Sequence, residues 1–326
     1  MERTIDVTAL GELLIDFTES GLSPQGNPLL EANPGGAPCN LLAMLTRLGH
    51  STAFLGKVGR DAFGDMLRKR VAGVGVDVSG LRVDEEIPTT LAFVHAQPGG
   101  ERDFSFYRKP GADLMLGEDE VDLEKIASSR VFHFGTLSST GEPVRSATRA
   151  ALAYAKAHGC LISFDPNLRP PLWDSLDRAR EEIDFGLSQC DVLKISDNEI
   201  EFMTGETDID VGVGKLLQRH PIPLVLATMG PGGSKAFFRG QTVFAPPKLT
   251  EKTIETTGAG DTFGGCFLHF VLKYGLDGLN EDRLHEMLTF ANAAASLVTT
   301  RKGPMRHAHP GGGPGLHGPG LRKKRQ

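Results

Sequence analysis

Short apolar segments alternate with amphipathic segments from about residue 131 onward, and this alternation constrains the fold more than any other feature. Strand-like apolar runs recur at Val131–Phe134, Leu161–Phe164, Val192–Ile195 and Leu224–Ala227. Helix-like segments lie between them at Val144–Ala157 and Glu181–Leu187. Strands that are joined through helices make right-handed crossovers, so their sheet is mostly parallel and covered by helices on both faces. The sequence therefore predicts a mostly parallel α/β fold.

Polar residues stand where three of these strands end. Asp165, Lys194 and Thr228 each fall at or beside a carboxyl end. Ligands of such sheets bind in the crevice beyond the carboxyl ends of the strands. We therefore expect the three side chains to face one crevice.

The first third of the chain carries a hairpin pattern instead. Thr89–Ala96 and Glu101–Tyr107 flank Pro98-Gly99-Gly100, which is a strong turn signal. Aromatic residues alternate along both arms, so the hairpin needs a surface to cover. Together with the segment around Asp16–Leu30 it is expected to form a small β lid, which would exclude water from a reaction in the crevice. Exposed edges of this lid predict pairing between two subunits, as a homodimer.

Length and charge limit the kinds of partner. With 326 residues, the chain suits one large domain that buries roughly 75% of its unfolded surface without a disulfide or metal. Its formal net charge of −6 argues against a nucleic-acid partner. No signal peptide or apolar run long enough to cross a bilayer is present, and the four separated cysteines suit a reducing compartment. We expect a cytoplasmic protein that binds neither nucleic acid nor membrane.

The last residues differ in composition from the rest. Residues 304–326 are rich in glycine, proline, histidine and basic side chains and have almost no apolar content. Such a segment cannot offset its ordering entropy by burial, so we expect a disordered tail after a folded domain at 1–303. A shifted reading frame or a truncation is one hypothesis for its origin.

Near residue 258, small residues lead into a helix that carries one carboxylate in its first turn, as Gly258-Ala259-Gly260-Asp261. Aromatic residues then recur at helical spacing, so the helix begins at or just before Asp261. Amides at a helix N-terminus that follows glycines can face an anion. A carboxylate beside that anion is repelled, unless it takes a proton from a hydroxyl that attacks a bound phosphoryl group. The alternative is an ordinary capped helix, because threonine and aspartate are common at helix starts.

A second glycine-rich helix entry lies at Gly35–Gly49. Leucines at helical spacing indicate the helix, and Pro38 suits its first turn. The paired glycines allow a ligand to approach closely, and Asn40 offers a donor and an acceptor to a hydroxyl. The alternative is a Gly-Pro loop before a core helix.

These two strings together resemble the signatures of the ribokinase-like (PfkB) sugar kinases. Thr256–Phe263 resembles the C-terminal signature, and Gly35–Gly49 followed by Gly56–Gly64 resembles the N-terminal one. The resemblance covers about residues 5–303. It implies a ribokinase-like three-layer α/β/α sandwich with a β lid, and ATP-dependent phosphorylation of a sugar hydroxyl.

The resemblance also implies roles for individual residues. Asp261 would be the catalytic base, while the amides of Gly258, Ala259 and Gly260, with Arg169, would hold the charge of the phosphoryl group. Sugar contacts would come from Asp16, Gly35, Gly36, Asn40, Phe106 and Arg108. Nucleotide contacts would come from Lys194, Thr228, Gly230, Gly233 and Asn292. Glu199 would act on Mg²⁺, through water. The plain alternatives are a helix-start carboxylate for Glu199, a core-helix residue for Asn292 and surface charge for Arg108.

The stretch Phe106–Leu114 resembles that of fructokinases in particular, and Ser196 stands where the wider family has asparagine. Both features favour transfer to the 6-hydroxyl of fructose, with ATP and Mg²⁺ as cofactors. Glu255 stands where the family usually has aspartate close to a monovalent-cation site, which leaves dependence on K⁺ open. The alternatives are a 2-keto-3-deoxygluconate kinase or another ribokinase-like sugar kinase. From a different class, the alternative is a non-catalytic subunit that binds sugar.

Overall fold

The apolar runs expected as buried strands are strands in the structure, a computed structural model that describes residues 3–96, 102–251, 253–254 and 256–300. They belong to a large sheet that consists of β1 (Ile5–Leu10), β4 (Thr52–Gly59), β5 (Leu81–Asp84), β8 (Ser129–Gly135), β9 (Leu161–Asp165), β10 (Val192–Ser196), β11 (Leu224–Thr228), β12 (Ser234–Phe238) and β13 (Gln241–Ala245). Within the described ranges, these nine strands lie in the order β13-β12-β11-β10-β9-β8-β1-β4-β5.

The pairing confirms a mostly parallel sheet. All neighbours from β11 through β5 pair in parallel, and only β12 and β13 are added antiparallel at one end. The N-terminal strand β1 lies inside the sheet, between β8 and β4. Because the parallel strands point the same way, the polar residues at their carboxyl ends share one edge.

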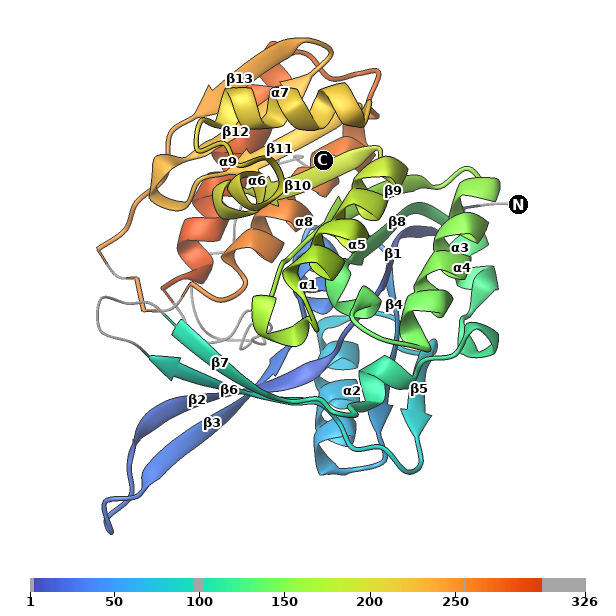
Figure 1. Cartoon of the computed structure of the whole chain (residues 1–326), viewed down its shortest axis with the longest axis vertical. Helices are drawn as coiled ribbons and strands as arrows, with labels where there is room; N and C mark the ends of the chain where they lie inside the picture. The colour runs from blue at the N-terminus through green and yellow to red at the C-terminus, as the bar shows by residue number, and fades with distance from the viewer. Residues whose placement is uncertain (1–2, 97–101, 252, 255, 301–326) are drawn as a thin grey trace, which may run out of the picture.

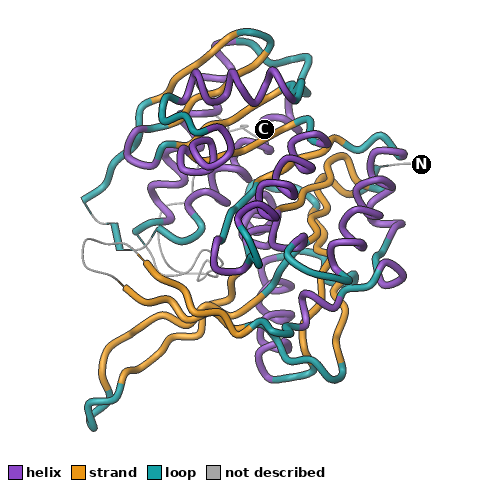
Figure 2. Tube along the Cα trace, in the orientation of Figure 1, coloured by secondary structure: helices purple, strands orange, loops and turns teal. Residues whose placement is uncertain are grey.

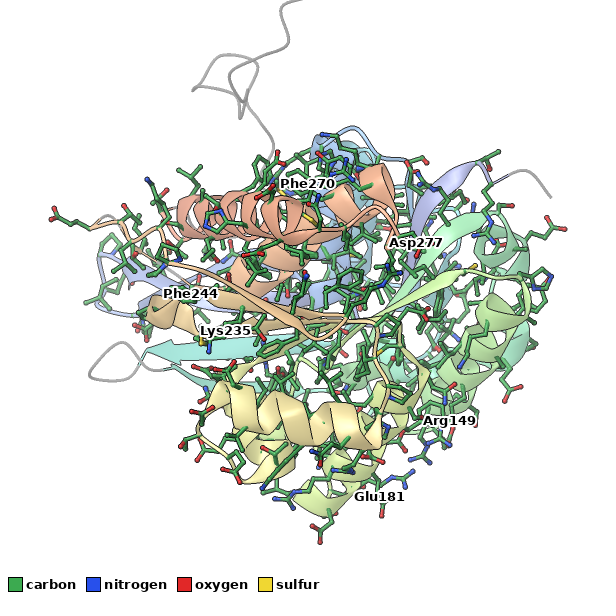
Figure 3. All side chains as sticks on the ribbon, turned by 90° about the horizontal axis from the view of Figure 1, so that it is seen from above. Arg149, Glu181, Lys235, Phe244, Phe270 and Asp277 are labelled. Atoms are coloured by element: carbon green, nitrogen blue, oxygen red, sulfur yellow. The ribbon has the colours of Figure 1, made fainter. Side chains whose placement is uncertain are left out.

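Helices cover both faces of the sheet. They are α1 (Ala37–Arg47), α2 (Ala62–Val74), α3 (Leu123–Ala127), α4 (Val144–Ala157), α5 (Leu176–Gln189), α6 (Asp197–Thr204), α7 (Ile209–Arg219), α8 (Ala259–Tyr274) and α9 (Glu281–Val298). Buried residues of α1, α2, α8 and α9 form one apolar cluster, and those of α3 to α7 form another. Seen from above, Phe270 of α8 and Arg149 of α4 lie on opposite sides of the sheet (Figure 3). The three-layer α/β/α prediction is confirmed (Figure 1).

One expected helix is longer than its apolar pattern indicated. The helix at Glu181–Leu187 extends over Leu176–Gln189. Its first turn is mainly polar and begins where the Ser175 hydroxyl accepts a hydrogen bond from the backbone N–H of Arg178. A serine cap satisfies one of the amides that a helix start leaves without an acceptor, so the helix begins earlier than its apolar residues.

Close contact between α1 and α8 depends on glycine. A Cβ atom at Gly265 of α8 would lie 2.9 Å from the carbonyl oxygen of Leu41 and 3.0 Å from the Cβ of Met44, both in α1. A side chain there would force the helices apart. The two helices therefore pack with their backbones close together, and their N-terminal turns reach the same edge of the sheet (Figure 1).

The lid is a second, four-stranded sheet of β2 (Leu14–Leu22), β3 (Pro28–Gly35), β6 (Leu91–Ala96) and β7 (Arg102–Tyr107) in the order β3-β2-β6-β7 (Figure 2). The expected hairpin is β6–β7, which pairs antiparallel. The other expected lid segment, around Asp16–Leu30, forms β2 and β3. Its last strand, β3, ends at Gly35, five residues beyond the expected end at Leu30. Aromatic rings connect the lid to the main domain. Within the lid, Phe17 stacks on Phe93 with ring centroids 5.0 Å apart, and Phe17 also packs edge-on against Phe63 of α2 at 5.6 Å.

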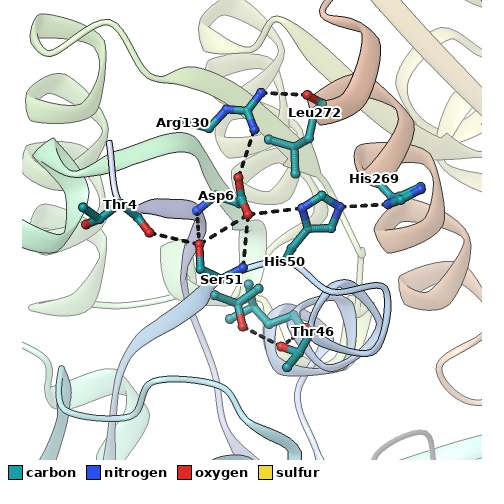
Figure 4. A network of polar contacts seen from close by, with 10 residues as sticks. Thr4, Asp6, Thr46, His50, Ser51, Arg130, His269 and Leu272 are labelled. Carbon is teal, nitrogen blue, oxygen red and sulfur yellow. Dashed lines mark hydrogen bonds and ion pairs between the residues drawn. The ribbon is translucent and has the colours of Figure 1, made fainter. Parts of the chain in front are cut away.

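At its other end, α8 is fastened to β1 by a polar network (Figure 4). Asp6 accepts from Arg130 at 2.9 Å and contacts His50 Nδ1 at 3.2 Å. His50 Nε2 lies 2.8 Å from Nδ1 of His269 in α8, and Arg130 donates to the carbonyl of Leu272 at 2.7 Å. These contacts anchor the C-terminal half of α8 to β1, and the packing at Gly265 anchors its N-terminal half to α1. Both contacts together fix the position of the N-terminal turn of α8.

Two predictions concern parts that the structure describes incompletely. The tail expected at 304–326 lies outside the described residues. Within the described part of the chain, no helix is both long and apolar enough to cross a membrane.

We predict that Phe267→Ala in the middle of α8 lowers the free energy of unfolding by about 3–5 kcal/mol, because it leaves a cavity in the core. Phe267 is fully buried, whereas Phe244 on the edge strand β13 is 48% exposed. Phe244→Ala is the matched control and is expected to cost less than about 1 kcal/mol. Urea unfolding measures both, and equal losses would contradict the central packing of α8.

Candidate active site

A cavity of about 480 Å³ lies between the carboxyl edge of the large sheet and the lid. Many residues that the sequence singled out line it together, although they come from segments far apart in the chain. These are Asp16, Gly36, Asn40, Phe106, Arg169, Lys194, Glu199, Gly258, Gly260 and Asp261. The structure thus brings both glycine-rich helix entries to one place.

The turn before α8 has the geometry expected of an anion site. Gly258 has a φ of 79°, in the left-handed region that favours glycine, and α8 begins at Ala259. Asp261 lies in the first turn of the helix. The Ala259 amide donates to the carbonyl of Thr256 at 3.2 Å, and Ala259 does not line the cavity. Of the residues at this helix start, Gly258, Gly260 and Asp261 therefore face the cavity.

Asp261 is held by one residue from the other helix entry. The side-chain amide of Asn40 donates to Asp261 Oδ2 at 2.7 Å. Burial is the largest effect on Asp261 and raises its pKa to about 6. The hydrogen bond from Asn40 lowers the pKa but does not cancel the effect of burial. The charge of Asp165 raises the pKa further, while those of Lys194 and Arg169 lower it. A carboxylate with a pKa near neutrality that borders a cavity is suited to accept a proton.

One side-chain atom of Asn40 has no hydrogen-bond partner among the described residues. This atom is Oδ1, which is buried, and the residue is 5% exposed. A buried acceptor without a donor is costly, so such atoms are usually satisfied by a ligand or water. The amide nitrogen of Asn40 thus binds the carboxylate of Asp261, while its buried side-chain oxygen lacks a donor.

Lys194 brings a positive charge to the start of α8. Its ammonium lies 3.1 Å from Asp165 Oδ2, and a Cβ atom on Gly260 would meet it at 3.1 Å. Burial alone would lower the pKa of Lys194, but the carboxylates of Asp165, Glu199 and Asp261 hold it above its usual value. The ammonium of Lys194 and the first turn of α8 therefore bring positive charge to the same part of the cavity lining, which suits an anion.

Glu199 fits both interpretations of its sequence. It accepts from the backbone N–H of Leu168 at 2.8 Å, and its other oxygen accepts from the N–H and hydroxyl of Ser196, both at 2.8 Å. It is therefore a helix-start carboxylate, and it also lines the cavity. Among the residues that the structure describes, no group of three or more His, Cys, Asp and Glu could hold a metal ion.

Arg108, which the sequence predicts at the sugar, is bonded to protein groups in the structure. This side chain is 3% exposed and does not line the cavity. Its guanidinium donates at 2.8 Å to Asp113, to the hydroxyl of Thr140 and to the carbonyl of Leu137. Arg108 therefore holds the segments around the cavity and is not positioned to contact a sugar.

Several residues expected at the nucleotide do not line this cavity. Thr228 ends β11, and Gly230 and Gly233 belong to the turn that follows it. The side-chain amide of Asn292 donates to the carbonyls of Ala245 and Pro246, and its oxygen accepts from the hydroxyl of Ser234 at 2.9 Å. Asn292 thus connects α9 to β12 and to the end of β13. Gly35, expected at the sugar, also lies outside the cavity lining.

The cavity is also lined by residues to which the sequence analysis assigned no role, namely Glu12, Leu14, Ala37, Leu137, Asn167, Ser196, Thr256 and Thr257. Asn167 has a φ of 45°, which is uncommon for a residue other than glycine. Its backbone N–H donates to Asp165 Oδ1 at 3.1 Å. The string Asp165-Pro166-Asn167 could have indicated this turn, because both Asp and Asn favour it.

The chain is similar to known carbohydrate kinases over most of its length. Residues 4–309 match the pfkB family carbohydrate kinase profile. A probable fructokinase-2 of Arabidopsis thaliana is 42% identical over 303 residues, which are 91% of each chain. A structure of fructokinase with bound ATP from Xylella fastidiosa has a TM-score of 0.83 at 30% identity, covering 92% of this chain and 94% of that one. A fructokinase from Vibrio cholerae O395 in fructose, ADP and calcium ion bound form has a TM-score of 0.83 at 30% identity, covering 93% and 96%.

We predict that Arg108→Met lowers the free energy of unfolding by about 3–5 kcal/mol, because it leaves the buried carboxylate of Asp113 without its cation. Asp113→Asn in the same chain should restore part of the loss, since the unpaired charge is removed. Urea unfolding of the single and double variants measures this. If Arg108→Met unfolds at the same urea concentration as wild type, the structural role of Arg108 is contradicted, and the contact with a ligand that the sequence predicted is favoured instead.

Proposed function

The chain belongs to the pfkB family of carbohydrate kinases, and on that premise we propose that it phosphorylates the 6-hydroxyl of fructose with ATP, giving fructose 6-phosphate and ADP. The observation that carries this proposal is the environment of Asp261. Its carboxylate borders the cavity in the first turn of α8, bonded to Asn40 and close to the ammonium of Lys194. A base and a site for an anion thus share one helix turn.

Asp261 is the proposed general base. It accepts the proton of the 6-hydroxyl as that oxygen forms a bond to the γ-phosphorus of ATP. The bond from the γ-phosphorus to the bridging oxygen then breaks, and ADP leaves. A pKa of about 6 keeps most of the carboxylate ionised at neutral pH and close to the operating range of a base.

The proposed phosphoryl site combines helix amides with two cations. The first amides of α8 have no acceptors within their own helix, and the positive end of the helix dipole lies there. Lys194 and Arg169 line the same cavity and would neutralise charge on the phosphoryl group. In phosphoryl transfer, positioning and charge stabilisation account for most of the catalysis.

Mg²⁺ fits this site as an ion held mostly by phosphates and water. Glu199 lines the cavity, but both its oxygens already accept hydrogen bonds from Leu168 and Ser196. Mg²⁺ usually keeps several waters in phosphate sites, so Glu199 would hold it through water. The bound ion would supply positive charge that offsets the negative charge of the phosphates. Dependence on K⁺ stays open, because Glu255 lies outside the described residues.

The cavity favours a neutral polyol over an acidic sugar. Glu12, Asp16 and Asp261 line it and would repel the carboxylate of 2-keto-3-deoxygluconate. A substrate carboxylate needs a cation, but Arg108 is bonded to Asp113 and lies outside the cavity lining, while Lys194 is paired with Asp165. Asp16, Gly36, Asn40 and Phe106 are proposed sugar contacts. A non-catalytic binding subunit has less support, because the base and the glycines beside it are both present.

The remaining proposals concern the nucleotide, the assembly and the compartment. Thr228, Gly230 and Gly233, beside Asn292, are proposed to flank the nucleotide outside the cavity. Exposed apolar side chains on the lid, at Leu22, Leu29, Leu30 and Tyr107, support a homodimer that pairs through it. Four buried cysteines without disulfides support the cytoplasm as the compartment.

The function is tested by coupled detection of ADP with fructose, ribose, mannose, tagatose and 2-keto-3-deoxygluconate. We predict the highest kcat/KM with fructose, and a kcat about 10²- to 10⁴-fold lower for Asp261→Asn, because the proton acceptor is lost. Asp277→Asn, at an exposed surface carboxylate, is the control and should keep full activity. If the enzyme turns over 2-keto-3-deoxygluconate and none of the other sugars, fructose is not the substrate. If Asp261→Asn keeps near-normal turnover, Asp261 is not the general base.

We predict that Asn40→Ala moves the acidic limb of the kcat/KM profile to higher pH, by about one pH unit, from its wild-type position near 6. The hydrogen bond from Asn40 favours the ionised carboxylate, so its removal raises the pKa of Asp261. The profile is measured from pH 5 to 9 with fructose. If the acidic limb of the Asn40→Ala profile stays at the wild-type pH while KM for fructose rises, Asn40 contacts the sugar but does not affect the pKa of Asp261.

A further inference from the structure

Glu12 is a buried carboxyl group in the wall of the cavity that neither family signature assigns. It lies in the short connection between β1, which ends at Leu10, and β2, which begins at Leu14. Its side chain is 3% exposed. Glu12 Oε1 accepts a hydrogen bond from the backbone N–H of Ala37 at 2.8 Å.

That hydrogen bond caps a helix that has no cap of its own. Ala37 is the first residue of α1, and the residue before it, Gly36, has no side chain to accept from the first turn. The backbone of Glu12 lies against the same turn, since a Cβ atom at Gly36 would lie 2.4 Å from the Glu12 carbonyl oxygen. Gly36 has a φ of 126°, which also requires glycine. Glu12 therefore determines the position of the turn through its backbone and its carboxyl group.

The same turn carries the proposed sugar contacts. Gly36, Ala37 and Asn40 line the cavity, and Asn40 bonds to Asp261 one helical turn into α1. A shift at Ala37 would move Asn40 relative to both the sugar and the base. The link from Glu12 to the reaction thus passes through the backbone of α1.

We propose that Glu12 is a positioning residue whose carboxylate holds the turn from Gly36 to Asn40 in its sugar-binding geometry and thereby sets the affinity for the sugar. The proposal rests on the proposed function for the identity of the sugar. A glutamine could accept the same hydrogen bond without a buried charge. The charge strengthens the bond to Ala37 and complements the positive end of the α1 dipole.

The buried charge has a cost that supports a functional reason for it. Burial raises the pKa of Glu12 to about 7. Because this value lies above that of an unfolded chain, the ionised group destabilises the fold, and stability falls as pH rises from about 4.5 to 7. The charged or titratable groups that act on Glu12 or contact its surroundings are Cys39 in α1 and Arg108 and Asp113 after β7. The cavity that Glu12 lines also holds the charged residues Asp16, Arg169, Lys194, Glu199 and Asp261.

Glu12→Gln tests the proposal, with Glu182→Gln as the matched control. Glu182 in α5 is a buried carboxylate that accepts from Arg149 and Arg178 and lies outside the cavity. At pH 8 we expect Glu12→Gln to raise KM for the sugar about fivefold with kcat within about twofold, because a neutral acceptor holds the turn less strongly. Its Tm should rise, since the buried charge is gone. Glu182→Gln should lower Tm and leave KM unchanged.

The pH dependence of KM shows whether the Glu12→Gln variant differs from wild type because it lacks the carboxylate charge or because its side chain packs differently. The ratio of KM between Glu12→Gln and wild type should approach one at pH 6, where wild-type Glu12 is mostly protonated, and reach its full value at pH 8. Glu12→Asp, which keeps the charge but is one methylene shorter, should also raise KM and serves as a second variant if glutamine prevents folding.

A KM for Glu12→Gln that equals wild type at pH 8 would overturn the proposal, as would a ratio that is constant from pH 6 to 8. Wild-type turnover decides the proposed function separately. If wild type prefers another sugar, the ratio is measured with that sugar. If wild type turns over none, the same variants are compared by the calorimetric dissociation constant for fructose, with the same expected ratio.

Discussion

The close packing of α1 on α8 is the constraint on which the rest of the site depends. Gly265 lets the two backbones meet near Leu41, so the N-terminal turns of both helices end at one edge of the sheet. One turn carries Asn40 and the other Asp261, and the hydrogen bond of 2.7 Å between them is the direct result. Asn40 and Asp261, which are 221 residues apart in the chain, thereby become part of one site. The polar network at the far end of α8 holds this arrangement in place, because it anchors the helix to β1.

Charge in the cavity is balanced between carboxylates and cations. Asp165 is paired with Lys194, and both lie close enough to Asp261 to change its pKa in opposite directions. Desolvation makes each charge costly when it is alone, so the ionised groups persist as a set. A phosphoryl group with its negative charge would enter beside Lys194 and Arg169, where positive charge and helix amides are already in place. The protein therefore does not have to reorganise its charges during transfer.

Local patterns in the sequence were enough to predict four neighbouring parallel strands of the large sheet, the hairpin and the two glycine-rich helix starts that border the cavity. Helical and strand periodicity located the parallel strands, and the glycine-rich helix starts located Asp261 and Asn40. The partner of Arg108, Asp113, could not be predicted, because the local sequence of a basic residue beside a hairpin is the same whether the residue faces solvent, a ligand or a buried carboxylate. Glu12 was missed because its partner, the amide of Ala37, is brought to it only by folding.

The sequence by itself determined the order of strands and helices, the parallel sheet and the two glycine-rich helix starts. These depend on periodicity and on residues within one or two turns of each other, so they can be read along the chain. Only the tertiary structure decided which polar side chains face the cavity and which are bound to partners. That choice depends on contacts between residues far apart in sequence, as from Asn40 to Asp261 or from Asn292 to Ala245. Such pairs form when packing removes water from both groups and leaves each with a particular partner, and no local pattern records which partner that is.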